Sequence, residues 1–293
     1  MNFANLEIKL STKKIPLVVC KPEDTDSILA AKEAFELGYV DCIFVGNPDV
    51  IRKILEKETP GFAPEIVPAL TEEEAALKSI QLIREKRANA LMKGNISTPV
   101  LLKAILNSET GIKRSSVLSH VLIFEWKGKF KFLTDGGMIP HPTLSEKQEI
   151  LTNSVLIAQK LGIEVPKVAV LSAVETVNSK MPSTLDAAVL SKMGDRKQLG
   201  KCKVDGPLAL DNAISLEAAH HKNLFNEVVG DADVLVCPDI DSGNIFGKSL
   251  IYFAGVKAGG LLVGATVPVI LLSRADTKDI RLNSIKLALA AGI

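Results

Sequence analysis

Aromatic residues are scarce in this chain, which limits the ligands that it is expected to bind. Its 293 residues include 10 Phe, 2 Tyr and 1 Trp. Proteins that bind single-stranded nucleic acid rely on aromatic side chains that stack with the bases. The formal net charge is only +1, so no excess of positive charge attracts nucleic acid or an anionic membrane. Both partners are therefore disfavoured, and any anion must be bound by local groups.

Cysteines are few, and long apolar runs are lacking. The four cysteines form no CxxC pair, so their spacing indicates neither a zinc site nor a disulfide scaffold. Three of them lie in apolar or strand-like settings, where small buried side chains are expected. The first residues lack the apolar core of a secretion signal, and the apolar run 261–272 is too short to span a bilayer and contains a proline. We therefore expect a cytoplasmic protein.

Apolar residues make up 47% of the chain, enough for a sizeable core. Short strand-like runs alternate with longer helical segments, which predicts an α/β fold with mostly parallel sheets. The expected strands are 15–20, 42–45, 65–70, 90–93, 168–171, 234–237 and 267–272. The expected helices are 25–37, 71–86, 99–107, 144–161, 211–221, 244–257 and 279–291.

One pair of segments breaks this alternation. Residues 117–125 and 129–134 are apolar and rich in β-forming residues, and they flank Trp126-Lys127-Gly128. This pattern predicts an antiparallel hairpin, which we interpret as the entrance to a second domain. The expected first domain is 1–120 with 265–293, and the second is the inserted segment 121–264. We expect the active site in the cleft between the two domains.

The apolar run that ends at Leu272 leads directly into Ser273 and Arg274, after which helical periodicity resumes. Ligands in α/β sheets gather beyond the carboxyl ends of strands, where the next helix presents unpaired N–H groups. Arg274 adds a planar, permanently charged group suited to phosphate or carboxylate. The alternative interpretation is a helix cap followed by a surface ion pair.

Residues 90–99 repeat this pattern of a strand that leads into a helix. Lys93 and Gly94 follow the strand, and a Ser/Thr cap and a proline begin the helix. The segment predicts a phosphate-binding loop made by Lys93, Gly94, Asn95, Ser97 and Thr98. An ordinary joint between a strand and a helix, with a solvated lysine, is the alternative.

Residues 134–143 follow the hairpin and are rich in Gly and Pro. Paired glycines let the backbone approach a ligand closely, so we expect Asp135 and Gly136 to contribute to substrate binding. His141 lies between two prolines, and a lone histidine in a turn is more often a structural donor than a catalyst.

Residues 238–249 resemble a P-loop but have the wrong spacing, because Gly243 lies four residues before Gly247 where a Walker A loop needs five. The functional interpretation that remains is that Asn244 and Lys248, at the start of a helix, contact an anion or substrate. The alternative is a helix cap with a solvated lysine. A GxGxxG dinucleotide fingerprint after a strand is also lacking. No metal site is predicted, because nothing in the spacing of the acidic residues requires one.

Five segments, in this order, resemble the phosphate acetyl/butyryltransferase family. They are ALMKGNIST at 90–98, TDGGMIPHPT at 134–143, VDGPLALDNAIS at 204–215, PDIDSGNIFGKSL at 238–250 and VILLSRADTKDIRLNS at 269–284. Residues 171–184 are more similar to the butyryl-type branch than to the acetyl-type one.

The resemblance implies that acyl-CoA and phosphate are converted reversibly into acyl phosphate and CoA, with a butyryl or branched short-chain acyl group preferred. Coenzyme A is then a substrate, and no permanently bound cofactor is expected. The resemblance also implies a homodimer of two-domain αβα subunits similar to the isocitrate and isopropylmalate dehydrogenases. Two alternatives remain: a metal- and NAD(P)-dependent dehydrogenase of the same fold, and a non-catalytic sensor of CoA or a phosphorylated metabolite.

The resemblance assigns catalysis to a serine, an arginine and a downstream aspartate. The first two correspond to Ser273 and Arg274, which would stabilise charge on the carbonyl oxygen and on phosphate. Alignment with a one-residue gap makes Asp279 the base for the CoA thiol, and Asp276 is the alternative base. Acetyl-type members of the family carry a cysteine at the position of Asp276. They carry a second cysteine near Asp135, where this chain has a glycine.

Overall fold

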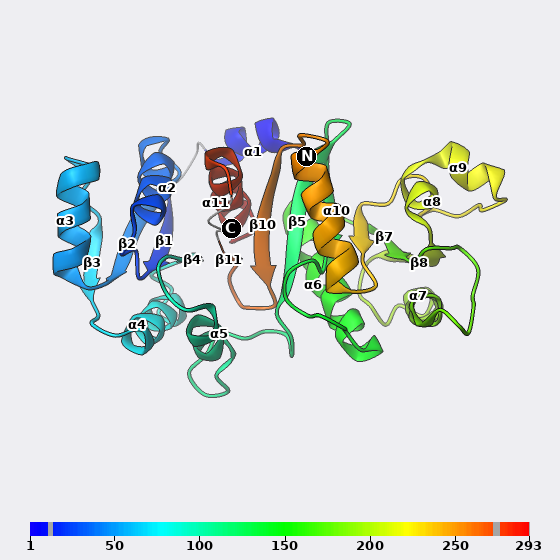
Figure 1. The fold of residues 1–293 in the computed structure, drawn as a ribbon, viewed down its shortest axis with the longest axis horizontal. Helices are drawn as coiled ribbons and strands as arrows, with labels where there is room; N and C mark the ends of the chain where they lie inside the picture. Colours follow the sequence, from blue (N-terminus) through cyan, green and yellow to red (C-terminus); the bar gives the residue numbers. More distant parts are fainter. Residues whose placement is uncertain (11–13, 272–275, 293) are drawn as a thin grey trace. The chain divides into compact units, whose positions relative to one another are not determined.

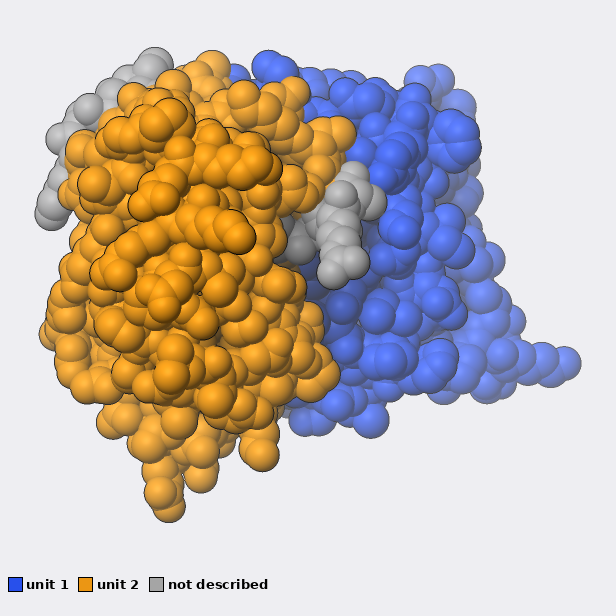
Figure 2. All heavy atoms as spheres, turned by 60° about the vertical axis from the view of Figure 1, so that its left-hand side comes forward, with its two compact units in different colours: residues 1–2, 117–258 blue, residues 3–116, 259–293 orange. Residues whose placement is uncertain are grey.

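The computed structural model describes residues 1–10, 14–271 and 276–292. The chain divides into two compact units, which Figure 2 draws in blue and orange. Unit 1 comprises Met1–Asn2 and Val117–Ala258, and unit 2 comprises Phe3–Ser116 and Gly259–Ile293. The sequence pattern placed the corresponding bounds after residue 120 and before residue 265.

Unit 2 is built on mostly parallel strands. They are Ile15–Cys20 (β1), Val40–Gly46 (β2), Glu65–Pro68 (β3), Ala90–Lys93 (β4), Ala258–Val263 (β10), whose first residue belongs to unit 1, and Val269–Ile270 (β11). The helices are Phe3–Leu10 (α1), Thr25–Glu36 (α2), Pro48–Glu58 (α3), Glu72–Arg84 (α4), Thr98–Leu106 (α5) and Lys278–Gly292 (α11). The strand order is β3-β2-β1-β4-β11-β10, parallel except between β10 and β11. Figure 1 shows α2 and α11 on one side of these strands and α4 and α5 on the other.

Unit 1 begins with the predicted hairpin. Its strands are Ser119–Trp126 (β5), Lys129–Thr134 (β6), Lys167–Leu171 (β7), Lys203–Leu208 (β8) and Val234–Val236 (β9). Its helices are Leu144–Lys160 (α6), Pro182–Asp195 (α7), Leu210–Ile214 (α8), Leu216–His221 (α9) and Ile240–Tyr252 (α10). The strand order is β5-β6-β9-β7-β8, in which only β5 and β6 are antiparallel.

Burial on both faces explains why the unit 2 strands are almost continuously apolar. In β1, which reads Ile-Pro-Leu-Val-Val-Cys, every residue except Pro16 is buried. Helices cover both faces of such parallel strands, so alternation between apolar and polar residues is not expected. Strand β1 pairs in parallel with β2 and β4. The carboxyl ends of these three strands therefore lie at one edge, where α/β proteins bind ligands.

Helices α4 and α6 begin at threonine caps. At α6, the Thr143 side chain accepts the N–H of Glu146, and the Glu146 carboxylate accepts the N–H of Thr143. At α4, Thr71 accepts the N–H of Glu74 at 3.1 Å, while the Glu74 carboxylate accepts the N–H of Leu70 at 2.8 Å. Each threonine supplies an acceptor to the first turn, which has unpaired N–H groups.

The helix expected over 211–221 is two helices, α8 and α9, because Ser215 interrupts it. Ser215 has an extended backbone, with φ −126° and ψ 113°. Its hydroxyl accepts the N–H of Ala218 at 3.3 Å and so begins a new helix. Serine favours such local side-chain hydrogen bonds over the interior of a helix.

Most observed bounds differ from the expected ones by one or two residues, and two elements show the physical reason or the largest shift. The strand expected over 267–272 has strand geometry at Val269–Ile270, after Pro268, which has no N–H to donate. The helix expected over 244–257 begins earlier, at Ile240, and ends at Tyr252. Among the described residues, every helix is too short or too polar to span a bilayer.

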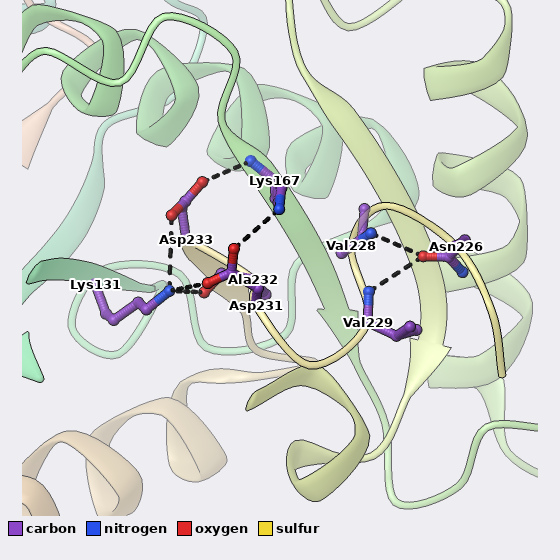
Figure 3. Close-up of polar contacts among 8 residues, drawn as sticks. All are labelled: Lys131, Lys167, Asn226, Val228, Val229, Asp231, Ala232 and Asp233. Carbon is purple, nitrogen blue, oxygen red and sulfur yellow. Dashed lines mark hydrogen bonds and ion pairs between the residues drawn. The ribbon is translucent and has the colours of Figure 1, made fainter. Parts of the chain in front are cut away.

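A buried lysine lies near the amino ends of β7 and β9 in unit 1 (Figure 3). Lys131 is 3% exposed, and its Nζ donates to the carbonyl oxygen of Ala232 at 2.7 Å. The same Nζ lies 3.6 Å from carboxylate oxygens of Asp231 and Asp233. Asp233 also accepts the main-chain N–H of Lys167 at 3.0 Å. A buried charge is costly unless it is paired and hydrogen-bonded, and this cluster meets both conditions.

Candidate functional site

Unit 2 places Lys93 and Gly94 at the carboxyl end of β4, next to the end of β1. Cys20 and Lys93 are register partners in the two strands. The N–H of Gly94 donates to the carbonyl oxygen of Cys20 at 2.9 Å, and the N–H of Asn95 donates to that of Lys21 at 2.7 Å. A Cβ on Gly94 would lie 2.4 Å from the Lys21 carbonyl oxygen. Only glycine therefore allows this approach of the two backbone segments.

The start of α5 provides several hydrogen-bond donors next to Lys93. Ser97 is the N-cap residue, and Thr98 is the first residue of the helix. Asn95 and Ser97 are exposed, whereas Lys93 and Thr98 are half-buried. The main-chain N–H of Ser97 donates to Glu72 Oε2 at 3.1 Å. An ammonium group, an amide and hydroxyl groups at a helix N-terminus suit the oxygens of a phosphate group.

Lys21 is a second cation at this edge, and the sequence analysis did not single it out. It follows β1 directly, and its φ of +56° lies in the left-handed region. Its Nζ is 3.2 Å from Glu23 Oε2, and Glu23 Oε1 accepts the N–H of Asn47 at 3.0 Å. The signal that would have identified Lys21 is a lysine at the end of an apolar strand, the same signal that Lys93 gives.

Three cysteines are buried, as predicted: Cys20, Cys42 and Cys237. Burial is the main cause that raises the pKa of Cys20 to about 12, although Lys21 and Lys93 lower that pKa. A thiol with this pKa is protonated at neutral pH and is a weak nucleophile. Cys20 therefore serves as a core residue at the end of β1.

The predicted catalytic residues Ser273 and Arg274 lie outside the described residues. The preceding strand, β11, runs parallel to β4, with Ile270 opposite Met92. Ile270 thus lies towards the same edge of the unit 2 strands as the end of β4. The predicted roles of Ser273 and Arg274 remain predictions.

The two candidate bases have different surroundings. Asp279 is exposed in the first turn of α11. Asp276 is half-buried and lines a groove of about 670 Å3 between α2 and the start of α11. Asp26 and Arg281 also line this groove, and their side chains form an ion pair at 3.0 Å. The choice of Asp279 over Asp276 remains a prediction.

Unit 1 brings Asp135 and Gly136 against the first part of α10. A Cβ on Gly136 would lie 2.8 Å from the carbonyl carbon of Gly243, and a Cβ on Gly243 would lie 2.4 Å from the carbonyl oxygen of Asp135. Asn244 Nδ2 donates to the carbonyl oxygen of Gly136 at 3.0 Å, across 108 positions of the chain. Three predicted site residues, Asp135, Gly136 and Asn244, thus lie together.

Asn244 and Lys248 do not lie at the start of a helix, which corrects the sequence prediction. Helix α10 begins at Ile240 because Asp239 caps it, and Asp239 Oδ1 accepts the N–H of Ser242 at 2.9 Å. Asn244 is therefore about one turn inside the helix, and Lys248 about two turns. Both side chains are exposed.

The cap of α10 is a stabilised carboxylate. The hydrogen bond from the Ser242 N–H is the main cause that lowers the pKa of Asp239, and His141 and Lys147 lower it further. Helix N-termini also favour negative charge. Within the described residues, no group of three or more His, Cys, Asp or Glu side chains is placed to hold a metal ion.

The fold defines an α/β protein with hydrogen-bond donors at the carboxyl end of β4, and comparison with known proteins shows its family. The sequence model of the phosphate acetyl/butaryl transferase family matches residues 49–289. A phosphate butyryltransferase of Clostridium acetobutylicum is 44% identical over 298 residues, which cover 99% of this chain and 98% of that protein. The chain therefore belongs to the phosphate acetyl/butyryltransferase family and is an acyltransferase.

Solved structures agree with this assignment. A branched-chain phosphotransacylase from Enterococcus faecalis V583 is similar with a TM-score of 0.83 and 34% identity, covering 95% of this chain and 99% of that one. A 4-hydroxythreonine-4-phosphate dehydrogenase from Klebsiella pneumoniae shares the fold with a TM-score of 0.56 and 13% identity, covering 96% and 100%. The predicted α/β class and its similarity to a dehydrogenase fold are confirmed.

Proposed function

We propose that this protein transfers a butyryl or branched short-chain acyl group between coenzyme A and inorganic phosphate. In one direction, a phosphate oxygen bonds to the thioester carbon, the carbon–sulfur bond breaks and the CoA sulfur receives a proton, which leaves acyl phosphate and CoA. The observation that carries the proposal is the similarity along nearly the whole chain to a phosphate butyryltransferase. The name of the solved branched-chain phosphotransacylase supports the same group of substrates.

We assign phosphate binding to the loop at the end of β4 and the start of α5. Lys93 supplies a charge, and Asn95, Ser97 and Thr98 supply donors next to it. Gly94 allows the loop to lie against Lys21. A second set of substrate contacts comes from Gly136, Asn244 and Lys248 in unit 1. The arrangement of each set within its own unit supports these assignments.

Transfer is direct in this proposal, with both substrates bound together. When CoA attacks acyl phosphate, its thiol must lose a proton, and Asp279 accepts it, with Asp276 as the alternative base. The tetrahedral intermediate carries negative charge on the former carbonyl oxygen, and Arg274 and the Ser273 hydroxyl stabilise it. Direct transfer needs no protein nucleophile, which agrees with the high pKa of the buried Cys20 thiol.

We further propose that the protein is a homodimer, as the family resemblance implies. The outer face of α10 carries exposed apolar side chains: Ile245 is 67% exposed and Tyr252 is 65% exposed, and Phe253, just after the helix, is 93% exposed. Exposed apolar side chains of this size on one element are common in protein interfaces. The mass in solution, measured by light scattering, tests this proposal.

The reaction is tested by mixing the protein with butyryl-CoA, with and without phosphate, and recording free thiol. No metal or nucleotide is added. We expect thiol release that requires phosphate, together with an equal amount of acyl phosphate trapped by hydroxylamine. A protein that binds CoA in a thermal-shift assay but releases no thiol would be a sensor, and a need for NAD(P) and a metal would favour the dehydrogenase alternative.

A further inference from the structure

The Asp135 carboxylate is fully used by main-chain groups of its own unit. Asp135 follows β6 and is 2% exposed. Its Oδ1 accepts the N–H of Gly137 at 2.8 Å, of Met138 at 3.1 Å and of His120 at 3.2 Å. Its Oδ2 accepts the N–H of Ile139 at 3.1 Å. A side chain that is so deeply buried and accepts four N–H groups has no room for a direct contact with substrate.

Residues of β5 and β6 also hold the loop that follows Asp135. A Cβ on Gly137 would lie 3.2 Å from Cβ and Cγ of His120, which is a tight contact. The carbonyl oxygen of His120 accepts the Thr134 hydroxyl at 2.9 Å, which holds the start of β5 against the end of β6. The Asp135 carboxylate thus accepts the N–H groups of Gly137, Met138 and Ile139, in a loop that lies between β5 and α10.

The position of Asn244 depends on this loop. Its side-chain amide donates to the carbonyl oxygen of Gly136, and Gly136 packs against Gly243 at a distance that excludes a side chain on either residue. A shift of the loop would therefore move both Gly136 and Asn244. A displaced group that contacts substrate weakens binding in the ground state and the transition state alike, which raises KM.

We propose that Asp135 is a positioning residue for the acyl-transfer site. Its buried carboxylate holds the main chain of residues 136–139 and, through Gly136, sets the position of the Asn244 amide. This inference rests on the proposed function, which assigns Gly136 and Asn244 to substrate binding. It also changes the role expected for Asp135, from a substrate contact to a support for its neighbours.

The test compares Asp135→Asn with Asp233→Asn, a matched variant in the same unit. Both carboxylates accept main-chain N–H groups, but Asp233 precedes β9 whereas Asp135 follows β6. The NH2 group of an asparagine side chain cannot accept a hydrogen bond, so the N–H groups on that side of the Asp135→Asn side chain face another donor. For this variant we expect KM for acyl-CoA or phosphate to rise about tenfold or more. For Asp233→Asn we expect both KM values within about twofold of the wild type.

Separate measurements of KM and kcat distinguish a displaced binding group from a loss of folded protein. Partial unfolding lowers the apparent kcat and leaves KM unchanged, because only the folded fraction binds and reacts. A misplaced binding group raises KM in the folded fraction. If Asp135→Asn lowers only kcat, or if both variants raise KM equally, the inference is overturned.

Gly137→Ala keeps the test decisive if Asp135→Asn does not fold. This variant retains the carboxylate but places a Cβ 3.2 Å from Cβ and Cγ of His120, so the loop and the start of β5 must move apart by a few tenths of an ångström. We expect its KM to rise at least about threefold, and unchanged KM values in Gly137→Ala would overturn the inference. A wild-type protein without phosphate-dependent thiol release would overturn the proposed function instead, and the inference with it.

Discussion

Arg274 is the residue to which the proposed chemistry assigns the largest effect. A planar guanidinium can donate two parallel hydrogen bonds to a phosphate group, which a lysine cannot do. Removal of one preorganised donor to a developing oxyanion typically lowers kcat by about a hundred- to a thousandfold. We therefore expect Arg274→Ala to lower kcat by this factor in the thiol-release assay.

The control for this prediction is Arg196→Ala, which removes an exposed arginine from the end of α7. Its kcat should remain close to that of the wild type. A kcat for Arg274→Ala within about twofold of the wild type would exclude Arg274 from the mechanism.

Asp239 gives a prediction about pH. Its pKa is lowered in the folded state by the Ser242 N–H, so the ionised carboxylate stabilises the fold above the ordinary pKa of 3.8. This stabilisation is lost as the pH falls through the lowered pKa. Asp239→Asn keeps a cap acceptor but removes the charge, so we expect it to cost about 0.3–1 kcal/mol at pH 7.

The measurement is urea unfolding of both proteins at pH 7 and near pH 3. The difference in the free energy of unfolding should shrink as Asp239 becomes protonated. A difference of equal size at both pH values would show that the charge of Asp239 does not stabilise α10.

Local sequence patterns predicted some residues of the candidate site and did not single out others that lie beside them. Lys93 and Gly94 were predicted because a strand, a cation, a glycine and a cap follow one another along the chain. Lys21 and Glu72 approach the same loop from other elements. His120 meets the Asp135 loop across the β5–β6 hairpin. Such contacts depend on tertiary packing, which short motifs do not encode.

At the scale of elements, the alternation of apolar runs and amphipathic segments predicted most of the strands and helices. The hairpin of β5 and β6 was predicted and is confirmed. Helices α1, α3 and α7 and strands β8 and β10 were not predicted. Strand β8 contains Asp205, Gly206 and Pro207, which are uncommon in strands. Helix α7 follows Met181, which makes no side-chain cap hydrogen bond, so no capping residue marks its start. Pairing with β7 and packing against α7 override these local preferences.

The cluster around Lys131 links several elements of unit 1 (Figure 3). Removal of one partner from a buried ion pair costs about 3–5 kcal/mol, because the other charges stay buried without compensation. Asp231 is 55% exposed, and Asp233 keeps its hydrogen bond to the Lys167 N–H. We therefore expect Lys131→Met to cost about 1–3 kcal/mol, less than a fully buried pair, mainly because the Ala232 carbonyl oxygen loses its donor. Urea unfolding measures this cost.

Lys129→Met is the matched control, because Lys129 lies on the same strand and is exposed. Surface substitutions usually change stability by less than about 0.5 kcal/mol. If Lys131→Met were no more destabilising than Lys129→Met, the buried cluster would not stabilise β6.

At the scale of the whole molecule, the order of five motifs predicted the family, and the comparisons confirm it. The acyl group is a finer question, because it depends on how a few side chains pack around several carbons. One methylene changes discrimination by only about 1–3 kcal/mol, or about 10–200-fold in kcat/KM. Composition and motif order do not encode such differences.

The most direct test of the central claim is a series of kcat/KM values for phosphate-dependent thiol release. The substrates are acetyl-, butyryl-, isobutyryl- and isovaleryl-CoA, without added metal or nucleotide. We expect kcat/KM for butyryl-CoA or a branched acyl-CoA to exceed that for acetyl-CoA by at least about tenfold, the effect of a methylene in a fitted pocket. Equal values across the series would contradict the butyryl-type assignment, and a lack of phosphate-dependent thiol release with all four would contradict the proposed reaction.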